Sequence, residues 1–224
     1  MREVEEVRMS VDVQRFLLNA VSWQAYEKIL DAIGDQPIRL TFDRGKLEIM
    51  SPSYRHESGA YLTGRLVDTL TFELDIPIKA GRTTTFRRKD LDRGLEADNC
   101  YWVQNAARMR GRKRIDLARD PPPDLAIEVE ISRGMLDRLG IYVALGIPEI
   151  WRFDGVVLRS LQLRKEGKYE VRRRSLAFPF LPLAEVGPLI VRAMDCENDT
   201  ESARLFQKWV RERVAPLFRS GNGA

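Results

Sequence analysis

The chain has 224 residues, 37 of them Lys or Arg and 33 Asp or Glu, with a formal net charge of +4. Its hydrophobic content of 44% is enough for a sizeable core and argues against intrinsic disorder. No apolar run approaches the roughly 18 residues of a membrane span, and the opening residues show no apolar stretch of the signal-peptide type. Two cysteines and one histidine exclude zinc sites built from these residues and triads that need a second histidine. We therefore expect a protein of the reducing cytoplasm with no membrane segment.

Positive charge is concentrated in two tracts of the sequence. Residues 82–119 contain 11 Lys or Arg and 5 Asp or Glu, and residues 159–174 contain 7 and 2. Such tracts favour an anionic partner, nucleic acid foremost, although solvated edges and hairpins have the same composition. Both interpretations apply to the most basic segment, a candidate DNA-backbone contact formed by Arg108, Arg110, Arg112, Lys113 and Arg114.

The first half of the chain predicts two helices and four strands. Ser22 is a suitable N-cap for a helix over 23–33 that Gly34 ends. Strands 38–42 and 46–50 flank a hairpin signal, Asp43-Arg44-Gly45. A helix over 54–74 has leucines every four residues, and strands follow over 76–88 and 100–104.

The second half alternates between strands and helices. Three prolines, 121–123, precede a β-branched strand over 125–131, and a helix begins at Ser132 or Gly134 and ends near Gly146. The remaining elements are strands over 147–153, 156–164 and 169–174 and a helix over 200–214. This order predicts a single α/β domain over residues 1–215, a mixed β-sheet flanked by helices, and a flexible tail over 216–224.

The strand that begins after the prolines carries an unusual row of acids. Because side chains alternate across a strand, one face holds Leu125, Ile127, Val129 and Ile131, and the other holds Asp124, Ala126, Glu128 and Glu130. Like charges in a row need a compensating cation or access to water. The pattern is thus open to two interpretations, a site for Mg²⁺ or Mn²⁺ or an ordinary solvated face. If the strand at 100–104 pairs beside this one, Asp98 can reach the same ion.

Four motifs in order resemble the Uma2 family. They are His56-Glu57 at a helix start, the segment from Gly94 through Glu96 and Asp98 to Gln104, the segment from Asp120 through Asp124 to Val129, and the segment from Tyr142 through Gly146 to Trp151. The resemblance spans roughly residues 16–163. It implies a restriction-endonuclease-like core of the PD-(D/E)XK type and metal-dependent hydrolysis of phosphodiester bonds, with double-stranded DNA as the substrate and a homodimer as a suitable assembly.

The resemblance also assigns roles to individual residues. Asp98 matches the Asp of the Pro-Asp motif, although Ala97 stands in the place of the proline, and Glu128 matches the acid of the (D/E)XK strand. These two would hold Mg²⁺ or Mn²⁺. Asp124 matches a second acid that supports the metal, and His56 matches a histidine that binds phosphate or assists proton transfer. The other interpretation of His56 is a surface or cap histidine.

The lysine of the endonuclease motif is missing, because Glu130 occupies its position. Arg138 lies four residues before Tyr142, on the same helical face, where relatives carry a lysine. Arg138 either stabilises charge on the phosphate or forms a salt bridge with Glu130, and it cannot act as a base. The leading hypothesis is a DNA endonuclease, and the alternatives are a non-catalytic nucleic-acid-binding module and a scaffold protein.

Overall fold

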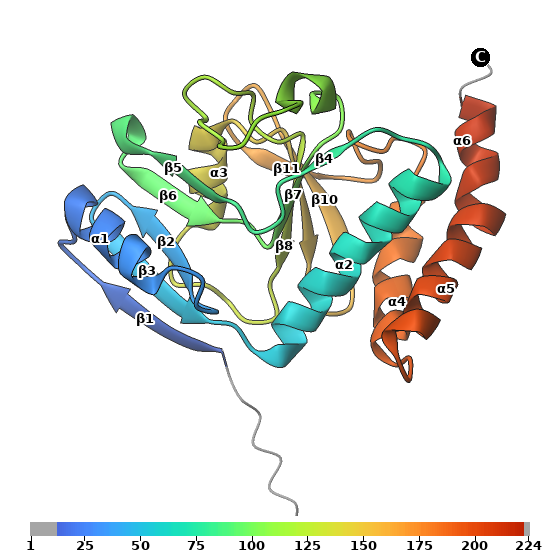
Figure 1. The fold of residues 1–224 in the computed structure, drawn as a ribbon, viewed down its shortest axis with the longest axis horizontal. Helices are drawn as coiled ribbons and strands as arrows, with labels where there is room; N and C mark the ends of the chain where they lie inside the picture. Colours follow the sequence, from blue (N-terminus) through green and yellow to red (C-terminus); the bar gives the residue numbers. More distant parts are fainter. Residues whose placement is uncertain (1–12, 222–224) are drawn as a thin grey trace, which may run out of the picture.

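Two β-sheets and the helices that cover them form the part of the chain that the computed structural model describes, residues 13–221 (Figure 1). The first sheet is antiparallel, in the order β1 (Gln14–Leu18), β3 (Lys46–Ser51), β2 (Arg39–Asp43), β6 (Arg93–Glu96), β5 (Thr85–Arg88). The second has the order β11 (Tyr169–Arg172), β10 (Leu158–Leu163), β9 (Glu149–Phe153), β8 (Leu125–Val129), β7 (Asn99–Trp102), β4 (Lys79–Ala80). This second sheet is mixed, because β8 and β9 are parallel.

Six α-helices occur within residues 13–221: α1 (Trp23–Ile33), α2 (Tyr54–Glu73), α3 (Arg138–Leu145), α4 (Leu183–Met194), α5 (Asp199–Trp209) and α6 (Ala215–Gly221). A π-helical turn, η3 (Val210–Val214), joins α5 to α6, and two 3₁₀ turns are η1 (Lys89–Leu91) and η2 (Ala106–Met109). None of the described helices is both long and apolar enough to span a membrane.

The first sheet has one apolar and one polar face. The apolar face packs against α1 through a buried cluster that includes Tyr26 and Phe42, whose rings stack 4.8 Å apart. A Cβ on Gly94 of β6 would lie 2.5 Å from the Tyr26 hydroxyl, so glycine permits this close approach. Strand alternation then turns Thr41 and Glu48, a cross-strand pair, to the opposite face. This polar face looks toward the second sheet.

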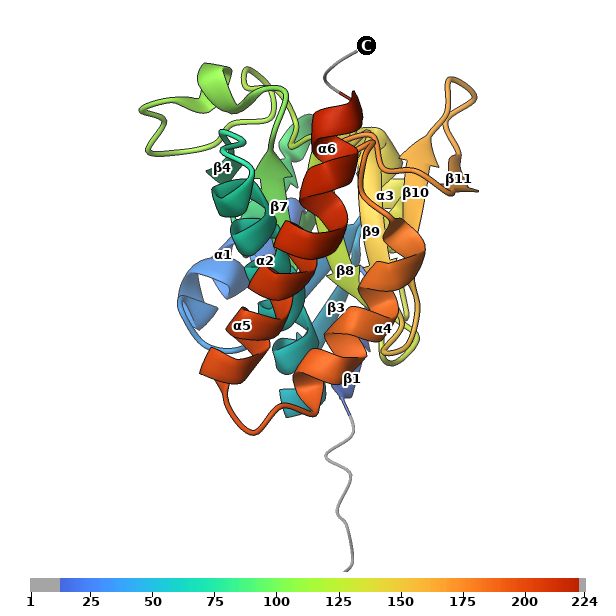
Figure 2. The same cartoon turned by 90° about the vertical axis from the view of Figure 1, so that its right-hand side faces the viewer.

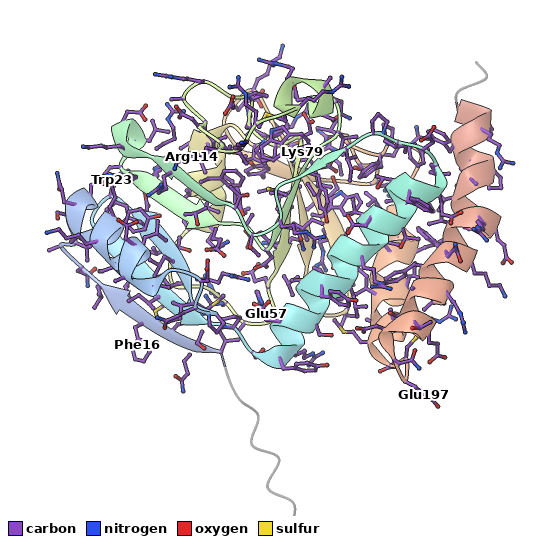
Figure 3. All side chains as sticks on the ribbon, in the orientation of Figure 1. Phe16, Trp23, Glu57, Lys79, Arg114 and Glu197 are labelled. Atoms are coloured by element: carbon purple, nitrogen blue, oxygen red, sulfur yellow. The ribbon has the colours of Figure 1, made fainter. Side chains whose placement is uncertain are left out.

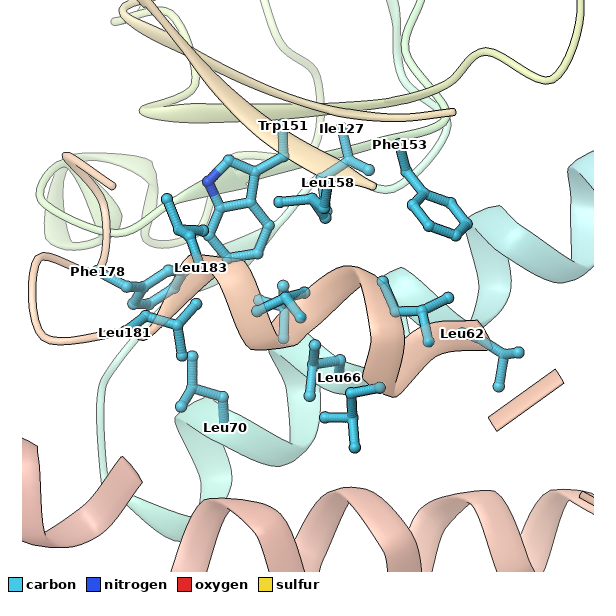
Figure 4. Close-up of a cluster of buried hydrophobic side chains, with 14 of the residues drawn as sticks. Leu62, Leu66, Leu70, Ile127, Trp151, Phe153, Leu158, Phe178, Leu181 and Leu183 are labelled. Atoms are coloured by element: carbon cyan, nitrogen blue, oxygen red, sulfur yellow. The ribbon is translucent and has the colours of Figure 1, made fainter. Parts of the chain in front are cut away.

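The second sheet is covered by helices on both faces. On one face, Ile127, Trp151 and Phe153 meet leucines of α2 and side chains of α4 (Figure 4). Figure 2 shows α4, α5 and α6 in front of β7–β10 on this side. On the other face, Ala126 and Ile150 pack against Ile141 of α3. The alternation along β8 therefore directs Glu128 to the α3 side.

The chain crosses between the sheets at two short links. Residues 81–84, among them Arg82 with a positive φ of 49°, separate β4 of the second sheet from β5 of the first. Ala97 and Asp98 then connect β6 of the first sheet to β7 of the second. Asp98 is thus placed at the boundary of the two sheets.

The predicted mixed α/β fold is confirmed, with differences in detail. The mixed sheet exists, but five strands form a separate antiparallel sheet, so the prediction of one continuous strand over 76–88 was wrong. The helix expected from Ser132 or Gly134 starts only at Arg138, because Asp137 caps it by accepting from the Gly140 N–H. Strands β1 and β6 and helix α4 were not predicted.

Part of the predicted tail is helical. Residues 216–221 belong to α6, where Phe218 packs edge-on against Phe180 with ring centroids 4.8 Å apart. The remaining residues of the predicted tail, 222–224, and residues 1–12 of the predicted domain lie outside the described residues.

A fully buried carboxylate on β9 stabilises the segment after β11. Glu149 accepts hydrogen bonds from Trp151 Nε1 and Ser160 Oγ through Oε1 and from Ser175 Oγ, Leu176 N and Ala177 N through Oε2.

We expect Glu149→Ala to lower the free energy of unfolding by about 3 kcal/mol, because buried donors lose their acceptor. Urea titration measures this, with Glu170→Ala on exposed β11 as the matched control. Equal losses in the two variants would contradict the prediction.

Candidate functional site

A pocket of about 410 Å³ lies where the polar face of the first sheet meets the end of β8 and the start of α3. Arg39 from β2 and Met50 from β3 line one side. Asp98 and Glu128 line it from the second sheet and its border, and residues 132–139 form a further wall. β7 pairs with β8, which meets the condition for Asp98 to approach Glu128, and both carboxylates line the same pocket.

Glu128 is held by two residues of α3. Arg138 binds it through both carboxylate oxygens, with Nε 3.1 Å from Oε2 and Nη2 2.6 Å from Oε1. The hydroxyl of buried Tyr142 donates to Oε1. Burial raises the pKa of Glu128, with Arg138 opposing the shift, and burial also raises the pKa of Tyr142, so this hydroxyl stays protonated and keeps donating.

Arg138 extends these contacts into the first sheet. Its Nη1 donates to Thr41 Oγ1 at 2.6 Å, and its Nη2 donates to the carbonyl oxygen of Glu96 at 2.7 Å. One guanidinium therefore connects strands β2, β6 and β8. The alternative interpretation of Arg138, a salt bridge to Glu130, does not hold, because Glu130 lies beyond the end of β8 and pairs with Arg152 at 3.4 Å.

Asp98 is paired with the chain's single histidine. His56 Nε2 lies 3.3 Å from Asp98 Oδ2, which also accepts the Val129 N–H at 2.8 Å. Burial alone would raise the pKa of Asp98, but the hydrogen bond and charge of His56, with Arg138, hold it below the usual 3.8. Burial opposes protonation of His56, yet Asp98 raises its pKa above 6.5. His56 is therefore a buried partner of Asp98 and is not a surface histidine.

Asp124 does not join these carboxylates. Its Oδ2 accepts from the backbone N–H groups of Val103 and Asn105, at 2.8 and 2.9 Å, and its Oδ1 accepts from Asn105 Nδ2 at 2.6 Å. It fixes the turn after β7 and is not among the described residues that line the pocket.

The basic segment also lies outside the pocket. All five of its cations are exposed around and after η2, and Arg112 pairs with Asp120 at 3.2 Å. Buried Met109 attaches the segment to the cluster beneath α3.

Several pocket residues were missed by sequence reasoning. Arg39 bridges Glu96 and Glu57 with N–O distances of 2.6 and 3.2 Å, and Figure 3 shows Glu57 at the start of α2, on the side facing the first sheet. The alternation of apolar and polar residues in β2 carried the signal for Arg39. The role of Tyr142 was detectable from its spacing of four residues after Arg138.

The donor set is compatible with a hard divalent ion bound by two carboxylates. Within the described residues, no group of three or more His, Cys, Asp or Glu is arranged to hold a metal. Magnesium commonly takes one or two carboxylates and completes its shell with water and substrate phosphate. Oδ1 of Asp98 accepts no hydrogen bond from residues 13–221, whereas both oxygens of Glu128 already contact Arg138. Asp98 is therefore the more available ligand.

Comparison with known proteins gives the family. The Uma2 family, described as a putative restriction endonuclease, matches residues 23–188. The chain belongs to the Uma2 family, as its motifs predicted. Among solved structures, it is similar to a putative nuclease belonging to DUF820 from Anabaena variabilis ATCC 29413, with 12% identity and a TM-score of 0.45, over 82% of this chain and 97% of that one. No curated protein matches the chain.

Arg138 is expected to contribute strongly to stability through its charge. Arg138→Met leaves the largely buried Glu128 without a cation, which we expect to lower the free energy of unfolding by about 3 kcal/mol. The double variant Arg138→Met/Glu128→Leu should recover at least half of the loss, because the uncompensated carboxylate is gone. Urea unfolding in EDTA measures both. A double variant less stable than Arg138→Met would contradict this explanation.

The pair of His56 and Asp98 predicts a pH-dependent stability of the metal-free protein. Because the pKa of His56 is raised in the folded state, its protonation stabilises the fold. This contribution to the free energy of unfolding is complete below pH 6.5 and is lost as the pH rises through the raised pKa. The lowered pKa of Asp98 gives a second contribution to the free energy of unfolding, which is complete above pH 3.8 and is lost as the pH falls through the lowered pKa. The stability difference between wild type and His56→Gln, from urea unfolding in EDTA, should thus be larger at pH 5 than at pH 9. A pH-independent difference would refute it.

Proposed function

We propose that the chain is a nuclease that hydrolyses phosphodiester bonds of double-stranded DNA and depends on Mg²⁺ or Mn²⁺. The observation that carries the proposal is the convergence of Asp98, which directly precedes β7, and Glu128 of the adjoining strand β8 on one pocket lined with arginines. Membership of the Uma2 family supports the same reaction class. The proposal includes a homodimer, in which each copy acts on one strand.

Asp98 and Glu128 would hold the metal ion. The chemistry supplied by such an ion is activation of a water molecule and neutralisation of charge on the attacked phosphate. His56 and the Val129 N–H fix the orientation of Asp98 by occupying Oδ2, which leaves Oδ1 directed to other partners. Arg138 and Tyr142 fix Glu128 in the same way.

Arg138 has two roles in the proposal, the positioning of Glu128 and a contact with a phosphate oxygen. Four of its five N–H groups are used by Glu128, Thr41 and Glu96. It therefore acts mainly as a positioning residue for Glu128, with one N–H left on Nη1 for a phosphate oxygen. The exposed basic segment, residues 108–114, would contact the DNA backbone at a distance from the reacting phosphate.

One observation favours a second candidate, a nucleic-acid-binding module without catalysis. Both oxygens of Glu128 are paired with Arg138, and the cations that line the pocket in the described chain are arginines and a histidine, with no lysine. If Arg138 never yields to a metal ion, the protein would bind DNA and leave it intact.

Plasmid nicking separates the two candidates. Supercoiled plasmid incubated with the protein and Mn²⁺ should become nicked, EDTA should abolish this, and Glu128→Gln or Asp98→Asn should reduce the rate at least 100-fold, as expected for the loss of a metal ligand. The matched control is Glu130→Gln, which changes the exposed carboxylate paired with Arg152 and should keep most of the rate.

The outcomes are distinct. Nicking that survives in both Glu128→Gln and Asp98→Asn would disprove the proposed site. A gel shift at low salt without any nicking would identify the binding module instead.

A further inference from the structure

The loop between β8 and α3 forms one wall of the pocket and is attached to the opposite sheet. Residues 132–137 all line the pocket. Glu48 of β3, 1% exposed, accepts the N–H groups of Met135 and Leu136 at 2.5 and 3.2 Å. These bonds explain why the helix expected from Ser132 is delayed, since a first-sheet carboxylate takes up backbone donors of the loop.

Arg15 of β1 strengthens this attachment. Its Nη1 lies 2.6 Å from Glu48 Oε1, and its Nη2 donates to the carbonyl and hydroxyl oxygens of Ser132, each at 3.4 Å. The loop is thus held near its beginning and near its end. Arg133 and Gly134 lie between these attachments, and Arg133 is exposed and lines the pocket.

Arg133 differs in charge pairing from the other cations of the pocket. Arg15 pairs with Glu48, Arg39 with Glu96, Arg138 with Glu128, Arg152 with Glu130, and His56 with Asp98. Within residues 13–221, Arg133 forms no ion pair or hydrogen bond. An anion entering the pocket therefore meets a guanidinium whose charge no described residue compensates.

We propose that Arg133 contacts a backbone phosphate of the bound nucleic acid and that Glu48 positions it by holding the loop. A guanidinium offers a planar pair of donors to two phosphate oxygens and needs no rearrangement of existing ion pairs here. The inference rests on the proposed function, because it takes the nucleic-acid backbone as the ligand. It adds a substrate contact on the wall formed by residues 132–139, beside the carboxylates that would hold the metal.

DNA binding in EDTA tests this contact without cleavage. The dissociation constant for a double-stranded oligonucleotide is measured from 50 to 200 mM salt. Arg133→Ala should weaken binding about fivefold at 100 mM salt and reduce the slope of log K against log salt by about 1, the effect of losing one phosphate contact. Arg204→Ala, which removes an exposed arginine of α5, is the matched control and should leave both quantities unchanged.

A double-variant cycle tests the role of Glu48. Glu48→Ala should weaken binding by the same factor as Arg133→Ala, and the double variant should show no additional loss, because Glu48 acts through Arg133. Glu48→Gln retains an acceptor for the loop N–H groups and should restore most of the affinity. If the affinity losses of the two single variants multiply in the double variant, and if Glu48→Gln does not restore the affinity, Glu48 has only a general structural role.

The failures can be told apart. If the wild type binds DNA and Arg133→Ala binds it with the same affinity and salt dependence, this inference alone is overturned. Absence of DNA binding by wild type at 50 mM salt, together with no nicking in Mn²⁺, overturns the proposed function and this inference with it.

Discussion

The ion pair between Arg138 and Glu128 is the contact on which the pocket depends. It is bidentate, it receives a further donor from Tyr142, and the same guanidinium reaches Thr41 and the Glu96 carbonyl in the first sheet. A buried pair of this kind is costly to break on one side only, because the remaining charge is left without compensation. Arg138 therefore fixes both the orientation of an acid of the site and the approach of the two sheets.

The row of acids along the β8 segment is compensated without placing the three carboxylates together. Asp124 accepts two backbone N–H groups and an amide, Glu128 binds an arginine of α3, and Glu130 binds Arg152 beyond the strand end. Alternation predicted one shared face for Asp124, Glu128 and Glu130, but only Glu128 lies within β8. It could not reveal that each one meets a different partner, since those partners come from separate elements.

Local patterns predicted the parts of the site that depend on local structure. Strand alternation and family motifs located Asp98 and Glu128, and helical spacing placed Arg138 and Tyr142 on one face, where both bind Glu128. The first sheet was only partly predictable: β1 lacks alternation, and β6 is four residues with a central Gly94 needed by Tyr26. The sequence predicted a helix from Ser132 or Gly134, but residues 132–137 form a loop whose backbone N–H groups bind Glu48. Glu48 lies 87 residues before Met135, and no local pattern connects the two positions.

The sequence separation of the bonds around the pocket has a consequence for folding. Arg138 and Thr41 are 97 residues apart, and Arg15 and Ser132 are 117 apart. The first sheet also contains β5 and β6, which enter it only after the chain has contributed β4 to the second sheet. Contacts between residues so far apart in the sequence give a high contact order. Forming them costs loop-closure entropy before any contact energy is gained, and this slows folding. The residues that line the pocket range from Arg15 to Arg152, so we expect the pocket to form late in folding, when the two sheets dock.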